Sequence, residues 1–86
     1  IRELEATLRE RAGRPPAESY TARLLASEIV KKVGEEAIEV VLAAKGQGDE
    51  RLVSEAADLV YHLLVLLQSR GLDWAAVEAE LARRRK

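Results

Sequence analysis

The chain has 86 residues, which permits a single domain over residues 1–86, and domains this small often gain stability by oligomerising. Hydrophobic residues make up 48% of the chain, charged residues 34% and aromatic residues 3%, a composition typical of an all-α helical bundle. The net charge of −1 excludes a basic field that would attract nucleic acid. The absence of cysteine excludes disulfides and thiolate metal sites. A chain without disulfides suits the reducing cytoplasm. The apolar run Leu63 to Leu67 is too short to span a membrane, no signal-peptide pattern opens the chain, and Ile1 in place of Met indicates a trimmed chain.

The N-terminal part predicts one helix and a short helical turn. Leu4 and Leu8 lie one turn apart in a helix expected over residues 2–11. The Pro15-Pro16 pair ends this helix, because two prolines cannot continue it. The Ser-Tyr-Thr segment at residues 19–21 then opens a short turn of helix that runs to about residue 25.

Capping residues and glycines predict three further helices. A helix over residues 27–45 begins with Ser27 as its N-cap and ends at the Gly-Gln-Gly segment of residues 46–48. Asp49 caps the next helix, which runs to about residue 70 and ends at Gly71. Asp73 caps the last helix, which ends in the cationic residues 83–86, and cationic residues complement the dipole at a helix C-terminus. The sequence shows no strand pattern.

The helix over residues 27–45 has an apolar face and an acidic face. At about 100° per residue its core stripe consists of Ile29, Val33, Ala37, Val40 and Ala44, with Val30 and Val41 beside it. The acidic face consists of Lys32, Glu35, Glu36 and Glu39, with Glu28 beneath them. A solvated charged face is the simpler interpretation, but Ile38 and Leu42 flank it with apolar surface. The like charges on this face destabilise the helix modestly, and a bound cation would reverse that cost.

The helix over residues 49–70 carries acids on an otherwise apolar segment. Its C-terminal half, with Val60 and residues 63–67, has no fully polar face, which indicates burial. Glu55, Asp58 and His62 nevertheless share one side of it at spacings of three and four. Carboxylates are rarely buried unless they are paired or bind a metal. A paired or metal-bound role is therefore favoured for Glu55 and Asp58.

Two acidic pairs, Glu36 with Glu39 and Glu55 with Asp58, are thus expected on neighbouring helices. The short connection at residues 46–48 makes these helices antiparallel, so that the carboxylate oxygens converge. Such a site suits a hard divalent cation, and Mg²⁺ also takes phosphate oxygens as ligands. A di-iron carboxylate bundle is the competing interpretation, but that class uses a Glu-x-x-His motif, which this chain lacks.

The chain resembles the phosphoribosyl-ATP pyrophosphatase family, one of the α-helical NTP pyrophosphohydrolases that include MazG-like proteins and dimeric dUTPases. The resemblance covers nearly the whole chain. It is most specific where the Lys-Lys-Val-Gly-Glu-Glu of residues 31–36 combines with the Asp-Leu-x-Tyr-His of residues 58–62. The other matching segments are residues 19–21, 24–25, 37, 39, 43–45, 55–57 and 63–64. The resemblance implies a bundle of four to five helices completed by homodimerisation. It also implies Mg²⁺-dependent hydrolysis of phosphoribosyl-ATP to phosphoribosyl-AMP and pyrophosphate, the second step of histidine biosynthesis.

The resemblance, together with the chemistry of phosphoanhydride hydrolysis, suggests a role for each candidate residue. The expected Mg²⁺ ligands are Glu36, Glu39, Glu55 and Asp58. The expected catalytic residues are Glu35, Glu36 and Glu39, with Glu35 either a ligand or the group that orients water. The expected contacts with the nucleotide substrate are Lys32, Ser19, Tyr20, Thr21 and His62. Simpler roles are a cap or turn for residues 19–21 and a hydrogen-bonded core position for His62.

Two other functions fit the same acidic pairs. A house-cleaning NTP pyrophosphatase of the same superfamily would prefer a free or non-standard nucleotide. A non-enzymatic helical dimerisation module would bind no magnesium, and its stability would stay equal or rise when Glu36 or Asp58 becomes alanine.

Overall fold

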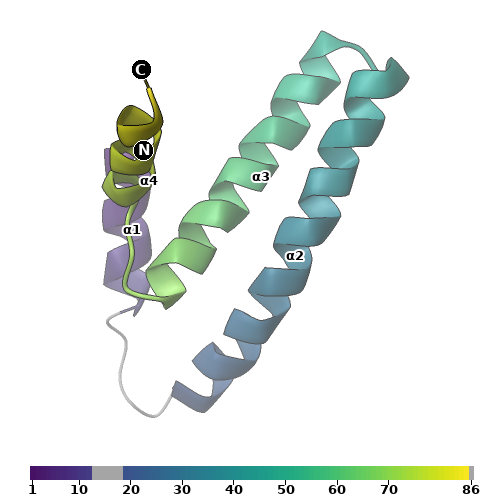
Figure 1. Ribbon diagram of the computed structural model, residues 1–86. Coiled ribbons are helices and arrows are strands. Elements are labelled where there is room, and N and C mark those ends of the chain that lie inside the picture. Colours follow the sequence, from purple (N-terminus) through teal and green to yellow (C-terminus); the bar gives the residue numbers. More distant parts are fainter. Residues whose placement is uncertain (13–18, 86) are drawn as a thin grey trace.

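The computed structural model of the chain describes residues 1–12 and 19–85, with side chains described for residues 1–10 and 27–85. Its helices are α1 (Arg2–Ala12), α2 (Ser19–Gly46), α3 (Asp49–Ser69) and α4 (Trp74–Arg84). α2 and α3 form a long antiparallel hairpin, and α1 packs on α3 (Figure 1). The predicted all-α class is confirmed, and the part of the chain that the structure describes contains no strand.

α2 is one continuous helix of 28 residues from Ser19 to Gly46, where the sequence predicted a short turn followed by a separate helix. Ser27 therefore lies inside the helix, and its predicted role as an N-cap is wrong. The physical reason is that residues 24–26, Leu-Leu-Ala, are strong helix formers, so nothing breaks the helix before Ser27.

The turn between α2 and α3 depends on Gly48. This residue is the N-cap of α3 and has φ 88° and ψ 161°, a conformation available essentially only to glycine. Asp49 is consequently the first residue of α3 rather than its predicted cap. Asp49 and Glu50 still favour the helix start, because acidic side chains in the first turn interact well with the helix dipole.

The predicted end of α3 and start of α4 are both confirmed. Gly71 has φ 70°, and its N–H donates to the carbonyl of Gln68. The N–H of Leu72 donates to the carbonyl of Leu67 at 2.9 Å, which completes a Schellman motif. The Oδ1 atom of Asp73 accepts a hydrogen bond from the N–H of Ala76 at 3.0 Å, as an N-cap side chain does.

A buried carboxylate on α1 holds the start of α4 in place. The side chain of Glu5 accepts a hydrogen bond from the N–H of Trp74 at 3.0 Å, so it satisfies a backbone donor at the N-terminus of α4. The carbonyl of Glu5 accepts a second hydrogen bond from the side-chain amide of Gln68 on α3 at 2.9 Å. Glu5, which is 7% exposed, therefore ties together three helices, with the buried Leu8 one turn away.

The last turn of α4 is held by an exposed ion-pair cluster. Arg83 and Arg84 both donate to the carboxylate of Glu80, and these hydrogen bonds, the one from Arg83 foremost, lower the pKa of Glu80. The cationic end of the chain thus has a local partner on its own helix.

The face of α2 that packs on α3 differs from the predicted core stripe. Ala43 is 1% exposed and lies on this face, while Ala44 is exposed. On a helical projection at about 100° per residue, the centre of the face lies near Ile29 and Val40 and includes Glu36. The predicted separation between a core stripe and an acidic face is therefore wrong for Glu36. On α3, Leu64 is fully buried.

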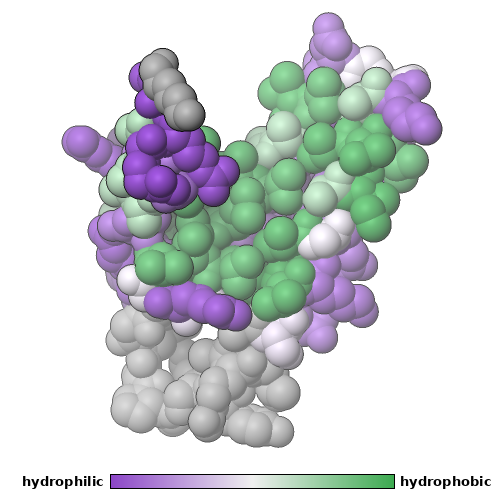
Figure 2. Space-filling view, in the orientation of Figure 1, coloured by the Kyte–Doolittle hydropathy of each residue, from purple (hydrophilic) through white to green (hydrophobic). Residues whose placement is uncertain are grey.

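Much apolar surface stays uncovered. The outer side of α2 carries a row of large apolar residues that are 47% to 61% exposed, namely Val30, Ile38, Val41 and Leu42. The C-terminal half of α3, predicted to be buried, is mostly half-buried. Figure 2 shows apolar side chains over the hairpin and in the opening between it and α4.

By length and composition alone, α3 is the one helix among the described residues that would pass as a membrane span. The central helix of a soluble protein passes the same test. α3 packs against both α1 and α2, and it carries Glu55 and Asp58 on the hairpin. Only 11% of its apolar stretch is buried among the described residues, so α3 adds to the uncovered apolar surface.

The cap of α4 gives a test of this account. Replacing Asp73 by alanine removes the hydrogen bond to the N–H of Ala76 and should lower the free energy of unfolding by about 1 kcal/mol. Asp73→Asn keeps a capping oxygen and should cost much less. Urea denaturation followed by circular dichroism measures both, and an equal loss in the two variants would contradict the capping role.

Candidate metal and phosphate site

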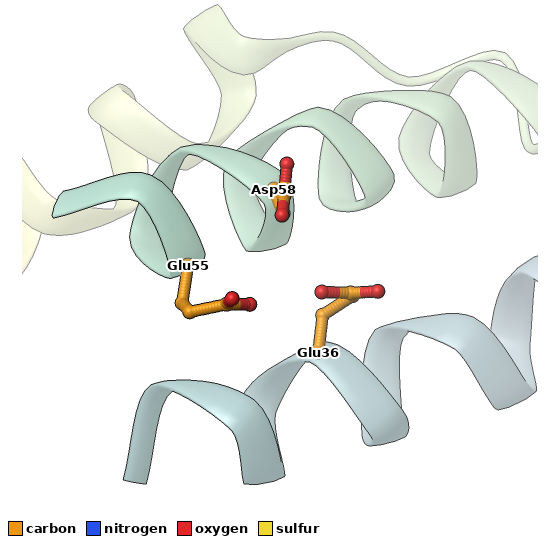
Figure 3. Close-up of side chains that lie close together, drawn as sticks. All are labelled: Glu36, Glu55 and Asp58. Carbon is orange, nitrogen blue, oxygen red and sulfur yellow. The ribbon is translucent and has the colours of Figure 1, made fainter. Parts of the chain in front are cut away.

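Three carboxylates meet between α2 and α3. Glu36 comes from α2, and Glu55 and Asp58 come from α3, and each offers an oxygen that lies within 4.8 Å of the oxygens of the other two. Figure 3 shows the Glu36 and Glu55 side chains extending into the space between the two helices, with Asp58 beside them on the α3 side. The antiparallel hairpin brings these acids together because the short turn at Gly48 sets α2 beside α3. Glu55 is buried, Glu36 is half-buried and Asp58 is exposed.

The remaining predicted residues of the acidic face lie further out. Glu39 is half-buried at the edge of the inner face of α2, and it is not one of the three carboxylates that converge. Glu35 and Lys32 are both exposed. The structure thus brings together three of the four predicted metal ligands and leaves Glu39 beside them.

Glu55 is the most buried of the converging acids, with 5% of its surface exposed. Its Oε1 atom lies 2.9 Å from a guanidinium nitrogen of Arg51, one turn earlier on α3. Sequence reasoning missed Arg51. The signal was its spacing of four residues from Glu55, which places two side chains of opposite charge on the same side of a helix.

His62 lies half-buried one turn after Asp58. Its Nδ1 atom is 2.7 Å from the backbone carbonyl oxygen of Asp58. A carbonyl only accepts hydrogen bonds, so Nδ1 carries the proton in this contact. Tyr61 makes an edge contact with the imidazole at a centroid distance of 5.2 Å. The ring is therefore held in a fixed orientation beside the acidic group.

The predicted substrate contacts Ser19, Tyr20 and Thr21 belong to the first turn of α2, but their side chains lie outside the described residues. Their role stays a prediction.

The three acids fit a small, hard divalent cation. Oxygens that share one Mg²⁺ at bond lengths of about 2.1 Å lie at most roughly 4.2 Å apart. The separation of up to 4.8 Å therefore needs only a sub-ångström adjustment of the side chains. All three donors are carboxylate oxygens, the ligand type that Mg²⁺ prefers, and the set contains no sulfur or imidazole that would favour a softer metal.

The repulsion among these carboxylates yields a test with a defined sign. Without metal, Glu36→Gln removes one of three mutually repelling charges and should raise the melting temperature. With Mg²⁺ at about 100 times its Kd, the wild-type chain should gain about 2.7 kcal/mol, and the variant should gain much less. Differential scanning calorimetry measures both effects.

Glu50→Gln is the matched control, because Glu50 is exposed in the first turn of α3 and stands apart from the converging acids. Equal magnesium-induced stabilisation of the wild-type chain and the Glu36→Gln variant would show that Glu36 binds no metal.

Comparison with known proteins relates this arrangement to one family. The family described as phosphoribosyl-ATP pyrophosphohydrolase matches residues 1–85. A phosphoribosyl-ATP pyrophosphatase of Pyrobaculum islandicum is 53% identical over 87 residues, covering 98% of this chain and 93% of the relative. The protein of that name from Erythrobacter litoralis is 53% identical over 98% of this chain and 84% of the relative. The one from Methanoculleus marisnigri is 50% identical over 100% of this chain and 94% of the relative.

Proposed function

Because the chain belongs to the phosphoribosyl-ATP pyrophosphohydrolase family, we propose that it hydrolyses phosphoribosyl-ATP to phosphoribosyl-AMP and pyrophosphate with Mg²⁺ as cofactor. This is the second step of histidine biosynthesis, and we place the reaction in the cytoplasm. The observation that carries the proposal is the meeting of Glu36, Glu55 and Asp58 between α2 and α3, in a chain with this family's sequence.

Each acid has a role in this proposal that follows from its position. Glu36, Glu55 and Asp58 hold the cation, which when bound offsets the charge of the phosphates and activates water. Glu39, half-buried on the turn of α2 after Glu36, is the fourth ligand of the proposed set. Glu35 is exposed on the same helix and serves to orient the attacking water or accept its proton.

The cationic and polar residues around the acids serve the substrate. Lys32 precedes Glu36 by one turn of α2 and meets phosphate from the solvent side. His62, whose ring is held through Nδ1 by the Asp58 carbonyl, contacts the substrate through Nε2. Residues 19–21 complete the substrate contacts.

Release of pyrophosphate from phosphoribosyl-ATP tests the substrate directly. We expect rapid release with Mg²⁺ from phosphoribosyl-ATP and little from dUTP, dCTP or ATP. Glu36→Ala should lower kcat by roughly 100-fold, because removal of one preorganised electrostatic group commonly has that effect. Glu78→Ala, which removes the same charge from an exposed position on α4, should leave kcat unchanged.

Preference for another nucleotide would assign the chain to house-cleaning NTP hydrolysis. Absence of release from every substrate by a folded chain would leave the dimerisation module as its function.

The active form we propose is a homodimer. The chain exposes 6830 Å², whereas a compact monomer of this mass exposes roughly 5000 Å². Its radius of gyration is 14.8 Å, against about 12 Å for a compact chain of this length. The excess area is of the size that each partner of an obligate dimer buries. The row of Val30, Ile38, Val41 and Leu42 on the outer side of α2 supplies apolar surface for such an interface.

A charge placed in this row tests the dimer. Ile38→Glu should convert the protein to monomer at concentrations where the wild-type chain is dimeric, because the interface would bury an unpaired carboxylate. Ile1→Glu, the same substitution at an exposed residue outside the row, should leave the dimer intact. Analytical ultracentrifugation distinguishes the forms, and a dimer that survives Ile38→Glu would exclude this row from the interface.

A further inference from the structure

Arg51 lies beside Glu55, the most buried of the three converging acids. Its guanidinium is 2.9 Å from Oε1 of Glu55, and its side chain is 56% exposed while that of Glu55 is 7% exposed. The positive charge therefore sits between the buried Glu55 carboxylate and solvent. In the part of the chain that the structure describes, Arg51 is the one cation recorded in an ion pair with any of the three converging acids.

Most N–H donors of the Arg51 guanidinium make no contact with Glu55. The structure records a single contact between the two side chains, through one Nη atom, and a guanidinium has several further N–H donors in a planar fork. Such a fork matches two oxygens of one phosphate, which a lysine ammonium does not. The exposed position leaves these donors open to a ligand that arrives from solvent.

We propose that Arg51 binds a phosphate group of the nucleotide substrate beside Glu55. The inference rests on the proposed function, because it is the cation held by Glu36, Glu55 and Asp58 that brings phosphate oxygens next to this carboxylate. A phosphate at that position comes within reach of a side chain that already contacts Glu55. Arg51 would thereby join α3 to the substrate contacts that Lys32 provides from α2.

Binding of inorganic pyrophosphate with saturating Mg²⁺, measured by isothermal titration calorimetry, tests the contact without turnover. Arg51→Gln should weaken binding roughly tenfold or more, because a charge-assisted hydrogen bond is lost. Arg51→Lys should lie between that variant and the wild-type chain, because it keeps the charge but not the fork. Arg70→Gln, which removes the same charge from an exposed position just past the end of α3, should bind like the wild-type chain.

A direct Mg²⁺ titration of the same variants separates a phosphate contact from an indirect effect through Glu55. Unchanged Mg²⁺ affinity with weakened pyrophosphate binding supports the proposal. Pyrophosphate binding that is equal in the wild-type chain and Arg51→Gln would overturn it and leave the proposed function standing. A loss of Mg²⁺ affinity in Arg51→Gln as large as its loss of pyrophosphate affinity would also overturn the proposal. Absence of Mg²⁺ binding by the wild-type chain would overturn the metal site and this contact together.

Discussion

The packing of α2 against α3 forces Glu36 towards Glu55 and Asp58, and the rest of the site follows from this contact. Three carboxylates within 4.8 Å of one another repel, and the burial of Glu55 adds a desolvation cost. The hairpin tolerates this cost because apolar surface is buried in the same contact, where Ala43 of α2 is 1% exposed. A divalent cation would turn the repulsion into attraction, so the same contact that costs stability in the metal-free chain creates affinity for the metal.

The two buried carboxylates of the described chain have different partners and therefore different uses. Glu5 is satisfied by the N–H of Trp74, so its negative charge serves to fix the start of α4. Glu55 has only Arg51, a half-exposed side chain on its own helix, and faces two other acids. Burial alone would not tell a structural acid from a functional one. The surroundings do, because Glu5 accepts a backbone hydrogen bond that fixes a helix start, whereas Glu55 lies within 4.8 Å of two like charges.

The sequence predicted the parts of the fold that local signals control. Gly71 and Asp73 mark the junction of α3 and α4 because turn and cap chemistry is local, and the acidic pairs followed from helical spacing and the short turn. The rotation of α2 was not predictable in this way. Whether Ala43 or Ala44 faces α3, and hence how deeply Glu36 sits, depends on the packing of both helices. The roles of Glu5 and Gln68 depend on contacts across more than 60 residues of sequence, which no periodicity reveals.

The central claim is that Glu36, Glu55 and Asp58 hold a divalent cation, and crystals grown with Mn²⁺ in place of Mg²⁺ test it most directly. We expect an anomalous-difference peak between α2 and α3, within bonding distance of oxygens from all three side chains. A well-ordered hairpin with no peak there, or with Mn²⁺ bound only elsewhere on the chain, would contradict it.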